Sequence, residues 1–80
     1  MKILLDAHLR ILRRLERAGG EGVVASELIQ DRVARDFVLN FLASHGYIER
    51  RRRFRGERVF ITNRGLEVLK SFGDGIDEEV

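Results

Sequence analysis

The stretch GYIERRRRFRGERVFITNRG, residues 46–65, decides the fold of this chain. It contains two short β-prone segments, residues 47–53 and 58–61, on either side of a tip formed by residues 54–57. A four-residue connection that contains glycine is a common hairpin length, because glycine can adopt the positive φ that such a tip requires. The sequence therefore predicts a β-hairpin in this stretch.

Six of the nine residues from 50 to 58 are arginine: Arg50, Arg51, Arg52, Arg53, Arg55 and Arg58. A hairpin buries one face at most, so most of these guanidinium groups must lie in water or against an anion. In one interpretation, the charges only protect an exposed sheet edge from aggregation. In the interpretation that we favour, the hairpin lies along a polyanion, because arginine binds phosphate in a bidentate manner and enters narrow minor grooves.

The chain has 80 residues and no visible internal repeat, which predicts one domain with a small core. Its net charge of +2 is unevenly distributed, because the last eight residues carry four carboxylates and no base. Residues 1–72 therefore hold 15 basic side chains and 9 acidic ones (13 minus 4), a net charge of +6. A basic body of this kind is typical of proteins that bind nucleic acid.

The sequence contains no cysteine, which excludes disulfides, thiolate metal sites and thiol catalysis. No apolar run approaches the ~20 residues that cross a membrane, and Asp6 and His8 interrupt the apolar start that a signal peptide would need. We therefore expect a cytoplasmic protein with no membrane partner, no metal and no cofactor.

Residues 2–18 have the spacing of an amphipathic helix, which Gly19-Gly20 would end. One apolar row on this helix consists of Leu4, His8, Ile11, Leu15 and Ala18, and a second row consists of Leu5, Leu9 and Leu12. Together the rows cover about 200° of the helix, which is wider than the ~100° needed to pack on one core. The second row is therefore either a homodimer interface or a surface that the C-terminal helix or the hairpin covers, and the sequence leaves both open.

A short strand is expected within residues 21–24 and a short helix within residues 25–30. Asp31 is a suitable N-cap for a longer helix over residues 32–45, which Gly46 would end. A short helix, a tight turn and a longer helix form a helix-turn-helix unit, whose second helix enters the major groove of DNA.

The second helix of this unit would have one face for the core and one for a ligand. We predict that the inward face consists of Ala34, Phe37, Val38, Phe41, Leu42 and His45. We predict that the face toward DNA consists of Arg32, Arg35, Asp36, Leu39, Asn40 and Ala43. Arginine can contact guanine, asparagine adenine, and leucine the thymine methyl group. Opposite charges four residues apart, Asp31 with Arg35 and Arg32 with Asp36, would instead pair along the helix, so we expect contacts to the DNA backbone to dominate binding.

Thr62 is expected to cap a last helix over residues 63–72. The sequence Gly73-Asp74-Gly75 would end that helix. The chain is thereby divided into a domain of residues 1–73 and an acidic, frayed tail of residues 74–80.

The predicted order of helix, short strand, short helix, longer helix, basic hairpin and helix resembles the winged-helix family of DNA-binding proteins, especially its compact archaeal regulators. The segment FVLNFLASHGYIE, residues 37–49, is similar to the family's YLxFLxxxGLI segment. The segment ITNRGLEVL, residues 61–69, is similar to the family's LTxxGxxLL segment. The resemblance implies an α+β, mostly helical fold with a three-helix core, a two- to three-stranded β-wing and a C-terminal helix. It also implies that residues 32–45 form the recognition helix and residues 50–58 the wing.

An enzyme would need nucleophilic, acid–base or metal-binding groups gathered in a pocket, and this chain offers few candidates. His8 and His45 lie on apolar helix faces, where a histidine more often packs or caps than catalyses, and no spacing of His, Asp and Glu resembles a metal site. We therefore predict a non-enzymatic, homodimeric protein that binds double-stranded DNA, as a transcriptional regulator or chromatin-associated protein of the nucleoid.

Two alternatives to duplex binding stay open. The first is a winged-helix module for protein–protein interaction, which would place the arginine hairpin on an acidic partner. The second is a protein that binds RNA or single strands, in which Phe54 and Phe60 would stack on bases.

Overall fold

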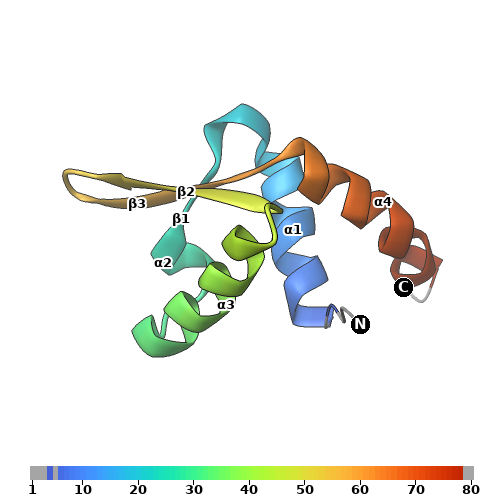
Figure 1. Cartoon of the computed structure of the whole chain (residues 1–80), viewed down its shortest axis with the longest axis horizontal. Coiled ribbons are helices and arrows are strands. Elements are labelled where there is room, and N and C mark those ends of the chain that lie inside the picture. The colour runs from blue at the N-terminus through green and yellow to red at the C-terminus, as the bar shows by residue number, and fades with distance from the viewer. Residues whose placement is uncertain (1–3, 5, 79–80) are drawn as a thin grey trace.

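The computed structural model describes Leu4 and residues 6–78, and this part of the chain confirms the predicted α+β, mostly helical architecture (Figure 1). The elements in chain order are α1 (Asp6–Ala18), the 3-10 helix η1 (Gly19–Glu21), β1 (Val23–Val24), α2 (Ala25–Leu28), α3 (Arg32–Ser44), β2 (Ile48–Arg53), β3 (Gly56–Ile61) and α4 (Asn63–Glu78). The predicted strand, the two helices of the helix-turn-helix unit and the hairpin are all present.

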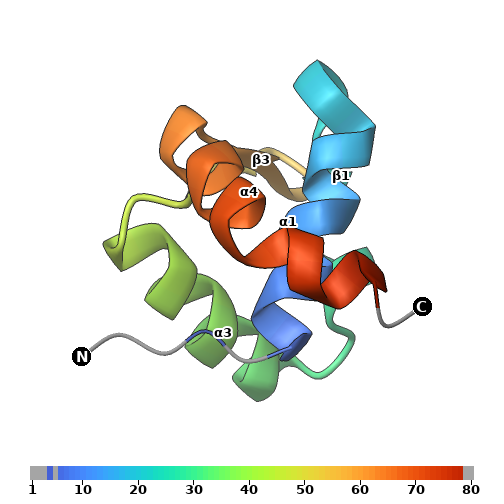
Figure 2. The same cartoon turned by 90° about the vertical axis from the view of Figure 1, so that its right-hand side faces the viewer.

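The hairpin of β2 and β3 projects from one end of the molecule, and α4 lies at the opposite end (Figure 1). The view turned by 90° shows α4 in front of α1, with α3 to one side (Figure 2). Helix α1 packs directly against α4. The hairpin is therefore the part of the fold that reaches farthest from the helical body.

The three strands form an antiparallel sheet in the order β1-β3-β2, with β3 in the centre. Val59 on β3 pairs with Val23 on one side and with Arg50 on the other, and it is fully buried. Arg53 pairs with Gly56, so the turn contains only residues 54–55 and is two residues shorter than the predicted tip. The strands therefore extend almost to the end of the hairpin.

The core lies where α1, α3, α4 and the sheet meet. Its largest fully buried side chains are Leu12, Leu15, Leu39, Leu42 and Val59. Leu9 and Leu12 are 4% and 0% exposed within a single chain, so the prediction that they form a dimer interface is wrong. The alternative, that the C-terminal helix covers this side of α1, agrees with the packing of α4 on α1. Leu5, the third residue predicted for that interface, lies outside the described residues.

Helix α3 begins and ends at the predicted caps. The carboxylate of Asp31 accepts a hydrogen bond of 2.8 Å from the backbone N–H of Ala34, which satisfies a donor that the first turn leaves unpaired. Gly46 follows the helix with φ of 80°, a conformation that favours glycine, and its N–H donates to the carbonyl oxygen of Ala43.

Thr62 joins the end of α3 to the start of α4. Its hydroxyl donates to the carbonyl oxygen of Gly46 at 2.6 Å and accepts from the N–H of Gly65 at 3.0 Å, which confirms the predicted cap. Gly65 is needed for close approach, because a Cβ there would lie 2.2 Å from the carbonyl oxygen of Tyr47. Helices α3 and α4 are thus held together at one backbone junction.

Helix α4 continues to Glu78, so the predicted end at Phe72 is wrong and part of the predicted acidic tail is helical. Glycine lowers helix stability by about 1 kcal/mol relative to alanine but does not forbid a helix, and Gly73 and Gly75 are accommodated within this one. The last two residues of the predicted tail, 79–80, lie outside the described residues. None of the described helices is both long enough and apolar enough to cross a membrane.

Replacing Thr62 tests the junction. We expect Thr62→Val to lower the free energy of unfolding by about 1–2 kcal/mol, because it removes the cap of α4 and leaves the carbonyl oxygen of Gly46 without its hydroxyl donor. Urea unfolding followed by circular dichroism at 222 nm measures this change. Thr62→Ser keeps the hydroxyl and serves as the control, and equal stability of the Val and Ser variants would contradict the assigned role.

Candidate nucleic-acid interface

Strands β2 and β3 form the wing, a ribbon whose side chains alternate between two faces. The face toward α3 carries Arg50, Arg52 and Glu57, and the opposite face carries Arg51 and Arg58. Arg53 lies next to the turn and lines the groove between the wing tip and α3. The predicted arginine finger therefore has two sides with different surroundings.

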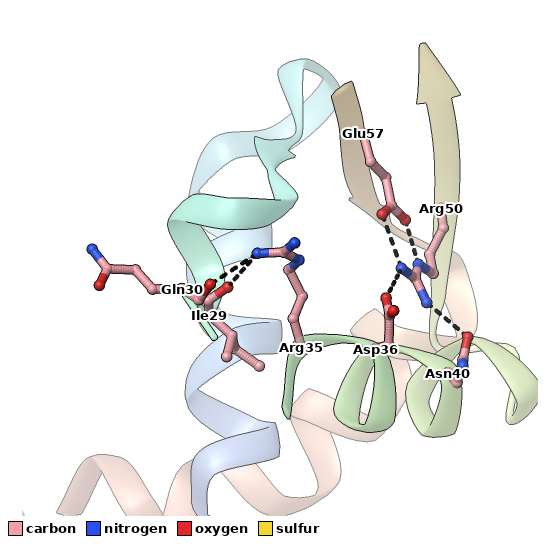
Figure 3. A network of polar contacts seen from close by, with 7 residues as sticks. All are labelled: Ile29, Gln30, Arg35, Asp36, Asn40, Arg50 and Glu57. Carbon is pink, nitrogen blue, oxygen red and sulfur yellow. Dashed lines mark hydrogen bonds and ion pairs between the residues drawn. The ribbon is translucent and has the colours of Figure 1, made fainter. Parts of the chain in front are cut away.

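Arg50 connects the wing to α3 and to the neighbouring strand (Figure 3). Its Nη2 lies 2.9 Å from Oε1 of Glu57, and its Nε contacts Oε2 of the same carboxylate. Nη2 is also 3.0 Å from Oδ1 of Asp36, and Nη1 donates to Oδ1 of Asn40 at 2.7 Å. The Arg50 and Glu57 side chains are only 15% and 14% exposed, so salt screens this pair weakly.

These contacts change the pKa of each ionisable group in the Arg50 network. Arg50 lowers the pKa of Glu57 below its usual 4.5 and the pKa of Asp36 below its usual 3.8. In both cases its hydrogen bond to the carboxylate is the largest cause of the shift. The hydrogen bond to Glu57 is the largest cause that raises the pKa of Arg50. All three groups are therefore charged at neutral pH, and one cation faces two anions.

Three of the six arginines predicted to bind an anion have partners within the chain. Arg50 is the first, and its guanidinium is too covered and too engaged to bind DNA as predicted. The guanidinium of Arg51 lies 3.3 Å from the carboxylate of Glu49 and 4.7 Å from the ring centroid of Phe60. Arg58 donates to the carbonyl oxygen of Glu21 at 2.9 Å.

A groove separates the wing tip from the N-terminal ends of α2 and α3. Its charged lining residues are Arg32, Arg35, Asp36, Arg52, Arg53, Arg55 and Glu57. Arg32, Arg52, Arg53 and Arg55 are all exposed, and no carboxylate in the described part of the chain forms an ion pair with any of them. The groove lining contains five arginines and two carboxylates, and both carboxylates are paired with Arg50. The groove is therefore strongly cationic.

The inward face of α3 agrees with the prediction only in part. The predicted residues that pack on the core are Val38, Phe41 and Leu42. Leu39 is fully buried and Ala43 packs against the core, so the prediction that they face DNA is wrong. Arg35 extends back over the preceding turn, where its Nη1 donates to the carbonyl oxygens of Ile29 and Gln30, both at 3.1 Å (Figure 3). This contact stabilises the turn between α2 and α3 and occupies part of the Arg35 guanidinium.

Two apolar residues of α3 are exposed although the sequence did not predict that they contact a ligand. Phe37, which was expected to face the core, is 79% exposed, and Val33 is 78% exposed. Apolar residues occur on nearly all sides of this helix, so periodicity alone does not define its inward face. The spacing of Leu39 and Leu42, three residues apart, is an equally good core signal and would have identified the face that is buried.

Arg32 and Asn40 lie on the exposed side of α3, as predicted. Arginine has donors only, so the Asn40 atom that faces Arg50 must be the carbonyl oxygen of the amide. The NH₂ group of Asn40 is then the part available to a ligand. Asn40 therefore presents donors, which suits the two acceptors of guanine better than the donor–acceptor pair of adenine.

Both histidines pack, as predicted. His8, Phe41, His45 and Tyr47 form a row of rings with successive centroid distances of 4.8, 4.4 and 5.7 Å. Burial lowers the pKa of His8, which favours its neutral form. Among the residues that the structure describes, no three His, Asp or Glu side chains are grouped closely enough to hold a metal ion.

The Arg50–Glu57 pair gives folding a measurable pH dependence. The pKa of Glu57 is lower in the folded chain than in the unfolded chain, so the pair stabilises the fold above pH 4.5 and this contribution is lost as the pH falls through the folded value. We expect the free energy of unfolding to decrease below pH 4.5 in urea titrations, and to decrease less steeply in Glu57→Gln, which does not titrate. An identical acid dependence in both proteins would contradict the coupling.

A matched pair of variants provides the control at pH 7. Arg50→Met leaves the Glu57 carboxylate largely covered and unpaired, so it should cost about 2–3 kcal/mol of stability. Arg51→Met removes the same side chain from an exposed pair on the same strand and should cost less than about 1 kcal/mol.

No family model and no curated protein matches this sequence. Two solved structures are similar to it, each with 16% sequence identity. One is a mutant of MepR from S. aureus bound to an oligodeoxyribonucleotide, with a TM-score of 0.78 over 95% of this chain. The other is the crystal structure of SSV1 F-93, with a TM-score of 0.67 over 98% of this chain.

The chain spans 60% of the MepR chain and 93% of the F-93 chain, so MepR contains a substantial part that has no counterpart here. The matches cover nearly all of this chain, which contains a helix-turn-helix unit, a three-stranded sheet with a projecting hairpin, and a C-terminal helix. This chain therefore has the winged-helix fold.

Proposed function

We propose that this protein binds double-stranded DNA, with α3 in the major groove and the wing on the flanking backbone or minor groove. The observation that carries the proposal is the groove between the wing tip and the N-terminal end of α3, where Arg32, Arg52, Arg53 and Arg55 have no carboxylate partner among the described residues. Cationic side chains on two walls of one groove are suited to a phosphate backbone that passes between them.

The Arg50 network supports this arrangement, because one guanidinium pairs with the two carboxylates closest to the groove and offsets half of their negative charge. Without Arg50, the charges of Asp36 and Glu57 would repel phosphate at the point where the wing meets α3. Arg50, Arg35 and Arg58 thus have structural contacts, whereas Arg32 and the arginines at the wing tip are free for a ligand. The similarity to a MepR mutant bound to an oligodeoxyribonucleotide is consistent with this proposal.

The proposed role in the cell is that of a transcriptional regulator or chromatin-associated protein of the nucleoid. Four free arginines on the DNA backbone would give affinity that depends little on base sequence. We therefore expect phosphate contacts to supply most of the binding free energy.

The salt dependence of duplex binding tests the proposal. Four neutralised phosphates predict that log affinity falls with log salt at a slope of roughly −4, since each contact contributes about −0.9. Fluorescence anisotropy with a labelled 20-base-pair duplex at several salt concentrations measures this slope. A slope near zero, or no duplex binding at low salt, would contradict the proposal.

A charge-matched pair of variants locates the interface. Replacing Arg52, Arg53 and Arg55 by alanine should reduce the slope to roughly −1 and weaken binding to all duplexes. Replacing Arg10, Arg17 and Lys70 by alanine removes the same charge from exposed positions on α1 and α4 and should change the slope little. An equal effect of the two triple-alanine variants on the slope would show that DNA binding depends only on the net charge of the protein.

Two other ligand classes are distinguished in the same assay. Phe54 is completely exposed at the wing tip, which favours single-stranded nucleic acid as a second candidate, because exposed aromatic rings stack on unpaired bases. Competition by an unlabelled single strand that exceeds competition by duplex would support that candidate. A protein partner would be indicated if neither nucleic acid binds at low salt.

The homodimer remains part of the proposal, although Leu9 and Leu12 cannot form its interface. A chain of this length buries only about 60% of the surface that its unfolded form exposes, less than larger domains bury, so a second subunit would add stability. Leu66 and Phe72 on α4 are 38% and 46% exposed and are candidates for that contact. We expect light scattering to give twice the chain mass of 9.3 kDa, and a mass of 9.3 kDa at micromolar concentration would exclude the dimer.

A further inference from the structure

We propose that α3 reads the 5-methyl groups of thymine through an apolar ridge formed by Val33 and Phe37. The inference rests on the proposed function and adds to it a base preference and the residues responsible. Its starting point is that both side chains are nearly four-fifths exposed, whereas the other large apolar side chains of α3 pack on the core: Val38, Leu39, Phe41 and Leu42.

The two residues lie four apart on α3, so they are one helical turn from each other on the same side of the helix. Their rise along the axis is about 6 Å, from 1.5 Å per residue, which corresponds to roughly two base-pair steps of 3.4 Å. A helix lying in the major groove could therefore place these two side chains against bases about two steps apart.

The polar side chains of α3 are less available for reading bases. Asp36 and the carbonyl oxygen of Asn40 bind Arg50, and the Arg35 guanidinium binds two backbone carbonyls behind the helix. Arg32 at the first position of α3 has no such partner among the described residues, but it lines the cationic groove and is placed for phosphate. Apart from the NH₂ group of Asn40, the exposed surface left for base contact is therefore largely apolar.

Thymine is the base that matches such a surface. Its methyl group projects into the major groove, where it is the one apolar group that distinguishes a base pair, and phenylalanine is among the side chains that contact it. Transfer of one methyl-sized group from water to an apolar contact corresponds to roughly fourfold in affinity.

A second protein molecule is a weaker match for the same ridge. A stable protein interface buries about 800 Å² on each partner, and two side chains supply only a fraction of that area. A second copy of this chain docked through the ridge would also bring two Arg32 side chains and two arginine-rich wings toward each other. Charge thus favours a polyanion as the occupant.

The experiment compares duplexes with and without the thymine methyl group. Duplexes are selected by the wild-type protein from a random pool, and the best one is synthesised again with deoxyuridine at every thymine. We expect the selected site to contain thymine and the wild-type protein to bind the deoxyuridine duplex roughly fourfold more weakly for each contacted methyl. Phe37→Ala should weaken binding to the thymine duplex and remove most of the preference for it.

Control variants separate this inference from the proposed function. Phe54→Ala, on the wing, should keep the thymine-to-deoxyuridine ratio, and the variant with alanine at positions 52, 53 and 55 should lose affinity for both duplexes while keeping that ratio. Because Phe37 is exposed, Phe37→Ala should unfold at the wild-type urea concentration, which excludes misfolding as the cause.

Three results would overturn the inference. The first is equal wild-type binding to both duplexes, which would leave the proposed function intact. The second is a thymine preference that persists in Phe37→Ala. The third is a change of oligomeric mass in Phe37→Ala with unchanged DNA binding, which would assign the ridge to a protein contact. Absence of duplex binding at low salt would refute the proposed function and this inference together.

Discussion

The attachment of the wing to α3 by Arg50 is the interaction on which the arrangement of the whole charged surface depends. A two-stranded ribbon has little stability by itself, and β2 and β3 extend well beyond the helical body (Figure 1). Arg50 reaches from β2 to a carboxylate on β3 and to two side chains on α3, so one guanidinium couples three elements. The direction of the wing relative to α3 is consequently set near the base of the hairpin, and the tip remains free.

This attachment divides the arginines into two groups with different roles. Arg35, Arg50 and Arg58 satisfy carbonyl or carboxylate oxygens of the chain itself, whereas the arginines at the wing tip have no such partner among the described residues. Carboxylates beside a cationic groove would ordinarily weaken anion binding. Here the two nearest ones, Asp36 and Glu57, are both paired with Arg50, and the five arginines that line the groove outnumber them, so the groove stays cationic.

Most of the fold was predictable because its boundaries depend on local chemistry. Asp31, Gly46 and Thr62 cap helices through hydrogen bonds to residues three or four positions away, and such contacts can be recognised in the sequence. The end of α4 was not predictable in this way, because two glycines only weaken a helix and packing against α1 stabilises it. The buried side of α3 was predicted only in part: Leu42 is buried as expected, but Leu39 is buried and Phe37 is exposed against expectation. The apolar residues fit more than one helical stripe, and only the neighbouring elements decide which stripe is covered.

The sequence by itself determined the order of the elements, the hairpin and its surplus of arginine, because capping, turn formation and net charge arise from residues close together in the chain. The tertiary structure alone decided which arginines are available and which side of α3 faces solvent. Arg50 forms an ion pair with Asp36, which is fourteen residues away in the sequence. Leu39 is buried, whereas Phe37 is exposed. Ion pairing and burial depend on distances between elements, and those distances exist only once the core has formed.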